Sequence, residues 1–254
     1  MTNILVETKD KIGFININRT EVKNALNLQT INELIAAFTE MDANNAIHCV
    51  ILGSQSREAF CSGADLKEFS QKKDIKEKTD YFDALSGLIL AIKNSPKTII
   101  TKVHGYALAG GLALVAAADI VLAANDAKFA LPELKVGMVP GVVMLALEEV
   151  INKRALNYMS LSGDVMDADE AFQIGLVSKI FSETVLDKKA LELAEEISNF
   201  SKDALATTKK MLQSGSTLDK KLKHRSAEMA AYSLTPACVE GTEAYLNKRK
   251  PNWP

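Results

Sequence analysis

Apolar and polar positions follow two different rhythms along the first half of the chain. Short runs rich in β-branched and aromatic residues predict strands, and apolar residues spaced three and four apart predict helices. Ile31, Leu34 and Phe38, for example, fall on one face of a predicted helix. Asn27 stands just before that helix, where a capping side chain is expected. The predicted strands are 4–8, 11–18, 48–53, 98–103 and 120–123, and the predicted helices are 28–42, 78–94 and 110–117.

Helical patterns alone follow Pro140. They cover residues 143–150, 153–160, 168–174, 186–199, 202–213, 218–233 and 236–247. Strands that alternate with helices predict an α/β fold whose sheet is largely parallel. The pattern breaks near residue 200, and short connections join the helices beyond it. We therefore expect a core over residues 1–199 and a C-terminal helical region over residues 200–254.

Composition and charge narrow the class of protein. With 254 residues, of which 47% are apolar and 24% charged, the chain can bury a substantial core as one globular unit. A net charge of −2 gives no basic surface for nucleic acid. The longest apolar stretch, 105–124, contains Asp119 and many small residues, which predicts a buried helix and strand and not a membrane span.

Cysteine content and the N-terminal residues bear on the cellular compartment. Cys49, Cys61 and Cys238 are scattered, with neither metal-ligand spacing nor a disulfide pattern. Residues 1–10 lack the basic segment followed by an apolar run that marks a secretory signal. Both features favour a protein of the reducing cytoplasm without a metal centre.

The first candidate for chemistry is a glycine-containing loop within residues 59–69 (AFCSGADLKEF). The loop turns on Gly63, and a glycine lets the backbone approach a ligand closely. Small neighbours would leave the N–H of Ala64 accessible. By itself, the segment fits a simple loop followed by a helix cap equally well.

The second candidate lies within residues 103–117 (VHGYALAGGLALVAA), where a very apolar helix begins at Gly110 and Gly111. The first N–H groups of a helix have no partner within it, and they carry the positive end of the helix dipole. Such donors can hold a carbonyl oxygen that becomes negative during a reaction. The alternative is a tightly packed core helix. The glycine pattern and lysine of nucleotide-binding loops are absent.

The third candidate lies within residues 128–141 (KFALPELKVGMVPG). Pro132 suits the first position of a helix, and Glu133 follows it. A glutamate at this place is commonly a surface partner of the helix dipole. Beside an apolar pocket it would instead serve as a general acid and base, because loss of hydration would move its pKa toward neutrality.

Together these stretches resemble the crotonase (enoyl-CoA hydratase/isomerase) superfamily. Residues 59–69 resemble its first oxyanion loop, and residues 105–141 resemble its second loop and acid/base segment. Three further segments resemble its adenine-binding loop and its later segments: 19–27 (RTEVKNALN), 163–177 (GDVMDADEAFQIGLV) and 244–251 (AYLNKRKP). Each motif alone is a weak signal, but together they occur in the expected order over nearly the whole chain.

The resemblance implies a fold of repeated ββα turns with a C-terminal helical region, assembled as homotrimers or homohexamers. It implies an acyl-CoA substrate, with no cofactor besides that coenzyme A and no metal, nucleic acid or membrane partner. The N–H groups of Ala64 and Gly110 would hold the thioester oxygen, and Glu133 would be the catalytic acid and base. The other implied contacts with substrate and coenzyme A are Lys23, Ala25, Leu26, Asp65, Lys67, Gly111, Gly141, Tyr245 and Lys248.

One departure from the family pattern leaves the reaction open. Two-acid hydratases of this family carry two glutamates; Glu133 matches one of them, and the other falls at the position of Ala113. Water addition to a 2-enoyl thioester divides well between two carboxylates, whereas moving a double bond from C3 to C2 needs a single base. Some hydratases of branched 2-enoyl-CoA also replace that glutamate. We therefore expect a hydratase, with a Δ3-Δ2-enoyl-CoA isomerase as the alternative and a non-catalytic acyl-CoA binder as a third hypothesis.

Several neighbouring polar residues are expected to be structural. We expect Asp65 to cap the helix after the first loop, His104 to be a packed loop residue, and Cys61 to fill a small space. The walls around the acyl group are expected to include Leu66, Phe69, Tyr81 and Phe82.

Overall fold

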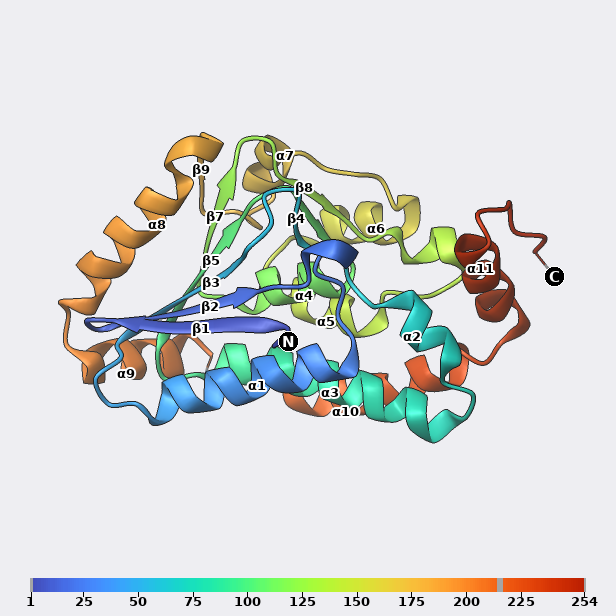
Figure 1. The fold of residues 1–254 in the computed structure, drawn as a ribbon, viewed down its shortest axis with the longest axis horizontal. Coiled ribbons are helices and arrows are strands. Elements are labelled where there is room, and N and C mark those ends of the chain that lie inside the picture. The colour runs from blue at the N-terminus through green and yellow to red at the C-terminus, as the bar shows by residue number, and fades with distance from the viewer. Residues whose placement is uncertain (1, 214–216, 254) are drawn as a thin grey trace.

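A six-stranded sheet in the order β1–β2–β3–β5–β7–β9 forms the centre of the fold (Figure 1). The computed structural model describes residues 2–213 and 217–253. The first two strands form an antiparallel hairpin and each later pair of neighbours is parallel, which confirms the predicted α/β class. The strands are β1 Ile4–Lys9, β2 Ile12–Ile17, β3 Cys49–Ser54, β5 Thr98–Val103, β7 Ile120–Ala124 and β9 Lys179–Phe181.

A second sheet of three parallel strands, in the order β4–β6–β8, positions the candidate site. Its strands are β4 Ala59–Cys61, β6 Tyr106–Leu108 and β8 Lys128–Ala130. Parallel neighbours end at the same edge of a sheet, where α/β proteins usually bind ligands. Each of the three candidate loops leaves the carboxyl end of one of these strands, so the small sheet brings the loops together. Sequence analysis missed these strands because three residues are too few to show an alternating pattern.

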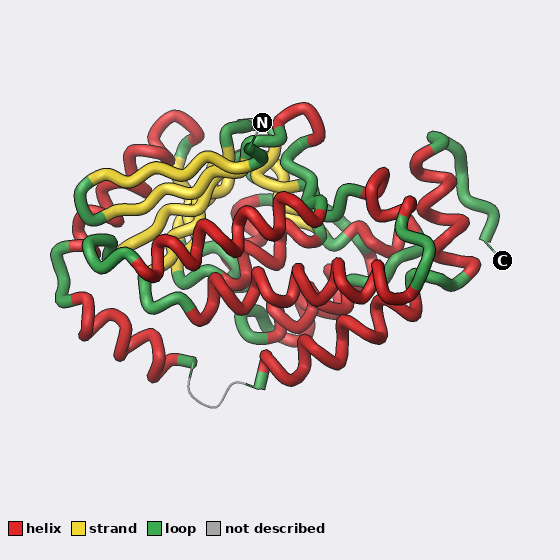
Figure 2. Tube along the Cα trace, turned by 60° about the horizontal axis from the view of Figure 1, so that its bottom comes forward, coloured by secondary structure: helices red, strands yellow, loops and turns green. Residues whose placement is uncertain are grey.

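Helices cover both faces of the large sheet. On one face α8 packs against β3, β5 and β7, and Leu186, Ala190 and Ala194 form a small separate core with the strands. On the other face a layer of helices that includes α1, α3 and α10 encloses the larger core (Figure 2). The helices are α1 Leu28–Ala43, α2 Leu66–Gln71, α3 Ile75–Asn94, α4 Gly110–Ala117, α5 Gly141–Glu148, α6 Lys153–Ser162, α7 Ala168–Gln173, α8 Glu183–Ser198, α9 Lys202–Leu212, α10 Leu218–Tyr232 and α11 Pro236–Leu246, with 3-10 helices η1 Thr20–Val22 and η2 Pro132–Val136.

The C-terminal helices pack closely on the rest of the chain. α10 contacts α3 and α5, and α11 contacts α2 and η2. The predicted boundary after residue 199 falls at the turn between α8 and α9, and the division into two regions stays a prediction. Every predicted helix is present, although three of them begin earlier than the apolar pattern indicates, at Ile75, Gly141 and Glu183. In α3 and α8 the first turn is mostly exposed, so it lies outside the apolar pattern, which marks the buried face of a helix. Within residues 2–213 and 217–253, no helix is long and apolar enough to cross a membrane.

Candidate active site

The three loops that leave the small sheet meet at a cavity of about 750 Å³. Its charged side chains are at least partly exposed, apart from Glu133, whereas a group of its large apolar side chains is buried. The charged group comprises Glu21, Lys23, Asp65, Lys67 and Lys135. The buried apolar group comprises Tyr81, Phe82, Leu85, Met138, Val142, Val143 and Met229. The cavity therefore has a polar mouth and an apolar inner part.

Backbone hydrogen bonds fix the first loop and leave one N–H group free. Leu26 donates its N–H to the Gly63 carbonyl oxygen at 2.7 Å, and Asp65 donates its N–H to the Leu26 carbonyl oxygen at 3.0 Å. These bonds flank Ala64, whose own N–H donates to no residue that the structure describes. Gly63 has a φ of +91°, in the region that favours glycine. The turn that the sequence predicted is thus held in place from both sides.

The second loop ends at a helix start with another free donor. Ala109 donates its N–H to the Ala130 carbonyl oxygen at 3.0 Å, and its φ of 49° and ψ of −121° are unusual for a residue with a side chain. Gly110 is the first residue of α4, and its N–H has no acceptor in the described part of the chain. A Cβ placed on Gly63 would lie 3.2 Å from the Gly110 nitrogen. The loops therefore touch, and their free N–H groups lie on adjoining backbone.

Glu133 presents a buried carboxyl group to the same cavity. Only 8% of the residue is exposed, and its Oε2 atom has no hydrogen-bond partner among the described residues. Burial raises the pKa of Glu133 to about 7, and a hydrogen bond to its own backbone N–H opposes this in part. The common role of such a glutamate as a surface partner of a helix dipole is therefore wrong here. A carboxyl group with a pKa near neutrality can both accept and donate a proton at neutral pH.

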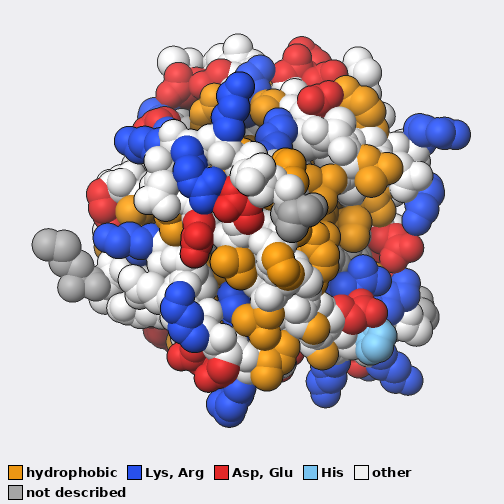
Figure 3. Space-filling model, turned by 90° about the vertical axis from the view of Figure 1, so that its right-hand side faces the viewer, with side chains coloured by type: hydrophobic (Ala, Val, Ile, Leu, Met, Phe, Trp, Pro, Cys, Tyr) orange, Lys and Arg blue, Asp and Glu red, His pale blue; other side chains and the backbone are white. Residues whose placement is uncertain are grey.

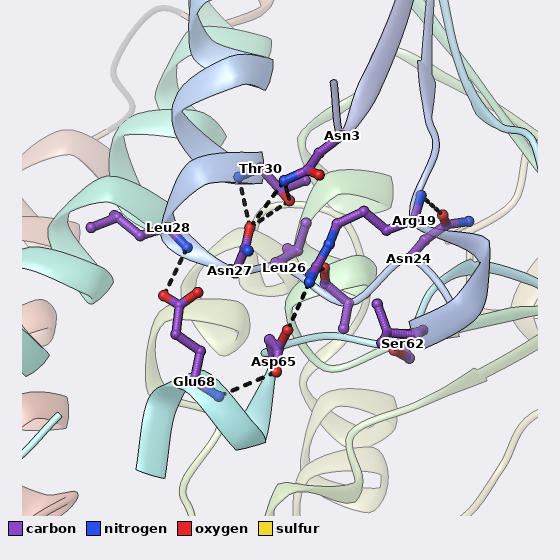
Figure 4. Close-up of polar contacts among 12 residues, drawn as sticks. Asn3, Arg19, Asn24, Leu26, Asn27, Leu28, Thr30, Ser62, Asp65 and Glu68 are labelled. Carbon is purple, nitrogen blue, oxygen red and sulfur yellow. Dashed lines mark hydrogen bonds and ion pairs between the residues drawn. The ribbon is translucent and has the colours of Figure 1, made fainter. Parts of the chain in front are cut away.

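A polar network ties the loop of residues 19–27 to the first loop (Figure 4). Arg19 pairs with Asp65 at 3.0 Å and donates to the Ala25 carbonyl oxygen at 2.5 Å. Asn24 adopts a left-handed φ of 57° and donates from Nδ2 to the backbone of β4 at 2.8 Å. The network therefore fixes the backbone around Ala25 at the mouth of the cavity.

Most of the predicted contact residues line the cavity, and three do not. Those in the lining are Ala64, Gly110, Glu133, Lys23, Ala25, Asp65, Lys67, Gly141 and Tyr245. Leu26 is wholly buried and contributes its backbone to the first loop. Gly111 faces Cys61, because a Cβ on Gly111 would lie 2.7 Å from the Cys61 Cβ. Lys248 follows α11 and lies outside the lining.

The inner wall contains residues that sequence analysis missed. Met229 of α10 lines the cavity although it is far along the chain from every motif, and no local pattern marks it. Of the expected wall residues, Leu66, Tyr81 and Phe82 are in the lining. Phe69 is not; its ring lies 5.3 Å from that of Tyr81, edge to face. Ala113 is wholly buried and lies outside the lining. Among the described lining residues, Glu133 has the only buried carboxyl group.

The residues expected to be structural have structural contacts. The Asp65 carboxylate accepts the N–H of Glu68 and caps α2. His104 is buried, with Nε2 3.3 Å from the Asp187 carboxylate. Cys61 is wholly buried, and burial raises the pKa of its thiol to about 12. No group of three or more potential metal ligands gathers within residues 2–213 or 217–253.

Comparison with known proteins agrees with this geometry. A family model described as enoyl-CoA hydratase/isomerase matches residues 7–254. A Rhizobium meliloti protein named "Probable enoyl-CoA hydratase" is 33% identical, covering 97% of this chain and 96% of its own. The crotonyl-CoA hydratase of Syntrophomonas wolfei is 31% identical, covering 99% and 97%. The crystal structure of an enoyl-CoA hydratase/isomerase from Xanthobacter autotrophicus has a TM-score of 0.90 and 26% identity, covering 96% of this chain and 93% of its own.

Proposed function

The chain belongs to the enoyl-CoA hydratase/isomerase family, and from this premise we propose that it adds water to the C2–C3 double bond of a 2-enoyl-CoA thioester. The observation that carries the proposal is the buried, unpartnered carboxyl of Glu133, which lines the same cavity as two free backbone N–H groups. Relatives named as hydratases, among them the crotonyl-CoA hydratase, support water addition over other reactions of the family.

The two free N–H groups are the proposed oxyanion hole. The thioester oxygen accepts hydrogen bonds from the N–H groups of Ala64 and Gly110. When water oxygen bonds to C3, the π electrons move toward the thioester and this oxygen takes the negative charge of an enolate. Preorganised donors stabilise that charge without rearranging, and loss of one such donor typically costs about 3–4 kcal/mol.

Glu133 performs both proton transfers in this proposal. In its ionised form it accepts a proton from the water that attacks C3. Once protonated it donates a proton to C2 of the enolate, which gives the 3-hydroxyacyl thioester and returns the carboxylate. The pKa of about 7, which results from burial, suits a group that must act in both directions near neutral pH. Because one carboxyl handles both protons, the hydroxyl and the new C2 hydrogen add to the same face of the double bond.

The apolar inner part of the cavity defines the acyl group that we propose. Apart from the catalytic carboxyl of Glu133, the buried side chains there are aromatic or aliphatic, and Tyr81 turns its hydroxyl away to donate to the Leu26 carbonyl oxygen at 3.1 Å. A second charge on the acyl group would lose its hydration there without gaining a partner. The proposed substrate therefore carries an apolar acyl group, and its coenzyme A lies at the mouth beside Lys23, Lys67 and Tyr245.

Assembly and compartment belong to the same proposal. Figure 3 shows apolar side chains gathered in a band across the α11 end of the molecule. On α11, Val239, Tyr245 and Leu246 are exposed by 45%, 60% and 39%, which supports an association that covers them. We propose a homotrimer or homohexamer in the cytoplasm that uses no cofactor beyond the coenzyme A of its substrate. Light scattering at micromolar concentration tests the assembly, and a 27.6 kDa monomer would refute it.

Isomerisation of a 3-enoyl-CoA to a 2-enoyl-CoA is the second candidate reaction. The specific observation in its favour is Ala113, which supplies no second carboxyl, since one base suffices to move a proton from C2 to C4. Absorbance of the conjugated thioester separates the candidates when purified protein is given crotonyl-CoA or a 3-enoyl-CoA. Loss of the band with crotonyl-CoA means hydration, and its gain with the 3-enoyl-CoA means isomerisation. No change with either substrate would refute both reactions and favour a non-catalytic acyl-CoA binder.

A further inference from the structure

The η2 segment, which carries Glu133, packs against α11, a helix more than a hundred residues later in the chain. η2 ends at Val136, and Gly137 follows it with a left-handed φ of +69°. Gly241 of α11 is buried against this turn, because a Cβ placed on it would lie 2.5 Å from the Val136 carbonyl carbon and 2.7 Å from the Gly137 nitrogen. The Val136 carbonyl oxygen would be closer still. Both obstacles are backbone, which cannot rotate aside as a side chain can.

The turn that Gly241 contacts is hydrogen-bonded to the backbone of Glu133. Gly137 N–H, one of the groups that a Cβ on Gly241 would meet, caps η2 on the carbonyl oxygens of Glu133 and Leu134. Met138 N–H donates to the Glu133 carbonyl oxygen at 3.0 Å. A displacement of this turn is therefore passed to the backbone of Glu133 through hydrogen bonds, without an intervening flexible side chain.

The helix that makes this contact is itself well fixed. Thr235 caps α11 by accepting the Cys238 N–H at 3.4 Å, and Ala237 lies one helical turn before Gly241, against Gly137. Cys238 and Thr242 are buried. Ala237 and Gly241, which are small and lie on one face of α11, thus let the backbone of α11 come into direct contact with the backbone at the end of η2.

We propose that Gly241 is a positioning residue, which holds the Glu133 carboxyl in its working place by letting α11 support the backbone of η2. The catalytic effect rests on the proposed function, whereas the contact between α11 and η2 does not. The same helix brings Tyr245 and Leu246 to the mouth of the cavity. α11 therefore contributes side chains to the mouth of the cavity and supports the η2 segment that carries Glu133, and Gly241 makes the second of these contacts.

The test is Gly241→Ala with Gly87→Ala as its matched control. Gly87 is also a helical glycine, but a Cβ there would meet only Ile35 Cδ1, at 3.7 Å. We expect Gly241→Ala to lower kcat for the preferred enoyl-CoA by about 10²-fold, since a misplacement of about 1 Å can have that effect. KM should change by less than about threefold, because Lys23 and Lys67 of the mouth lie on neither α11 nor η2. Gly87→Ala should stay within about twofold of the wild type in both constants.

The pH profile separates positioning from general damage. A displaced η2 admits water to the Glu133 carboxyl, so its pKa should move down from about 7 by at least one unit. A folded Gly241→Ala protein with wild-type kcat and an unchanged profile would overturn the proposal. So would a rise in KM that accounts for the whole loss of kcat/KM. If Gly241→Ala is insoluble, Thr235→Ala loosens the same helix without adding an atom; an unchanged kcat in that variant overturns the proposal.

One measurement keeps this proposal distinct from the proposed function. If the wild type transforms neither 2-enoyl-CoA nor 3-enoyl-CoA, the proposed function fails. The pKa of Glu133 can then be followed by NMR of protein labelled with ¹³C at glutamate carboxyls. A shift of at least one unit between wild type and Gly241→Ala supports the positioning role without any turnover, and identical titrations refute it.

Discussion

Replacing Glu133 by glutamine should remove activity and add stability, and the gain in stability should depend on pH. The carboxyl has a pKa of about 7 when folded, against 4.5 for a free glutamate. Between these values the folded protein binds the proton more tightly than the unfolded chain, so stability falls as pH rises from 4.5 to 7. Above pH 7 the folded protein holds a buried charge, which destabilises it by roughly 3 kcal/mol for this shift. Glutamine has nearly the same shape and no charge to bury.

Urea unfolding of wild type and Glu133→Gln at pH values from 4.5 to 8.5 measures this difference directly. We expect the advantage of the variant in unfolding free energy to grow by roughly 3 kcal/mol between pH 4.5 and 7 and to remain level above pH 7. Glu40→Gln makes the same chemical change at an exposed position of α1 and should stay within about 0.5 kcal/mol of the wild type throughout. A pH-independent advantage for Glu133→Gln would mean that the carboxyl is hydrated in the folded protein.

The same variant tests the catalytic role. Because water activation needs the ionised carboxyl, kcat/KM of the wild type should rise with pH through about 7. Glu133→Gln should lower kcat by about 10²–10⁴-fold while CoA thioesters still bind. Calorimetry with a 3-hydroxyacyl-CoA measures that binding. Near-normal turnover of every enoyl-CoA by Glu133→Gln would place the chemistry on other residues.

Three further predictions concern the surroundings of the site. Arg19→Ala should lower the free energy of unfolding by about 3 kcal/mol, because it leaves the carboxylate of Asp65, only 15% exposed, without a cationic partner. Arg57→Ala, at a side chain 54% exposed, should lower it by less than about 1 kcal/mol in the same urea assay. Met229→Ala should enlarge the apolar end of the cavity and raise the ratio of kcat/KM for decenoyl-CoA over crotonyl-CoA by about 10-fold or more, and an unchanged ratio would remove Met229 from the acyl wall. Lys209→Ala should lower unfolding free energy by about 3 kcal/mol with kcat retained, because Nζ lies 2.7 Å from the carboxylate of Asp119 and anchors α9; a loss of kcat in the folded variant would contradict this purely structural role.

Local sequence determined much of this protein by itself. The long helices and the buried strands follow from apolar periodicity, because a helical face or a parallel strand must place its apolar residues at fixed intervals to bury them. The turn at Gly63, the helix start at Gly110 and the Pro132 start of η2 depend on backbone properties of single residues, and a residue's backbone preferences can be read without knowing its neighbours in space. The motifs in order also pointed to the family.

Tertiary structure decided what those pieces do. A glutamate after proline is exposed in one fold and buried in another, and its pKa depends on the water that packing excludes from it. The three short strands that gather the loops are too short to carry a periodic signal, and they pair between segments about 22 to 47 residues apart. Met229 joins the cavity and Gly241 supports η2 only because α10 and α11 fold back on the core. Such contacts join positions that are distant in the chain, and no local pattern of residues encodes which distant segment will pack against which.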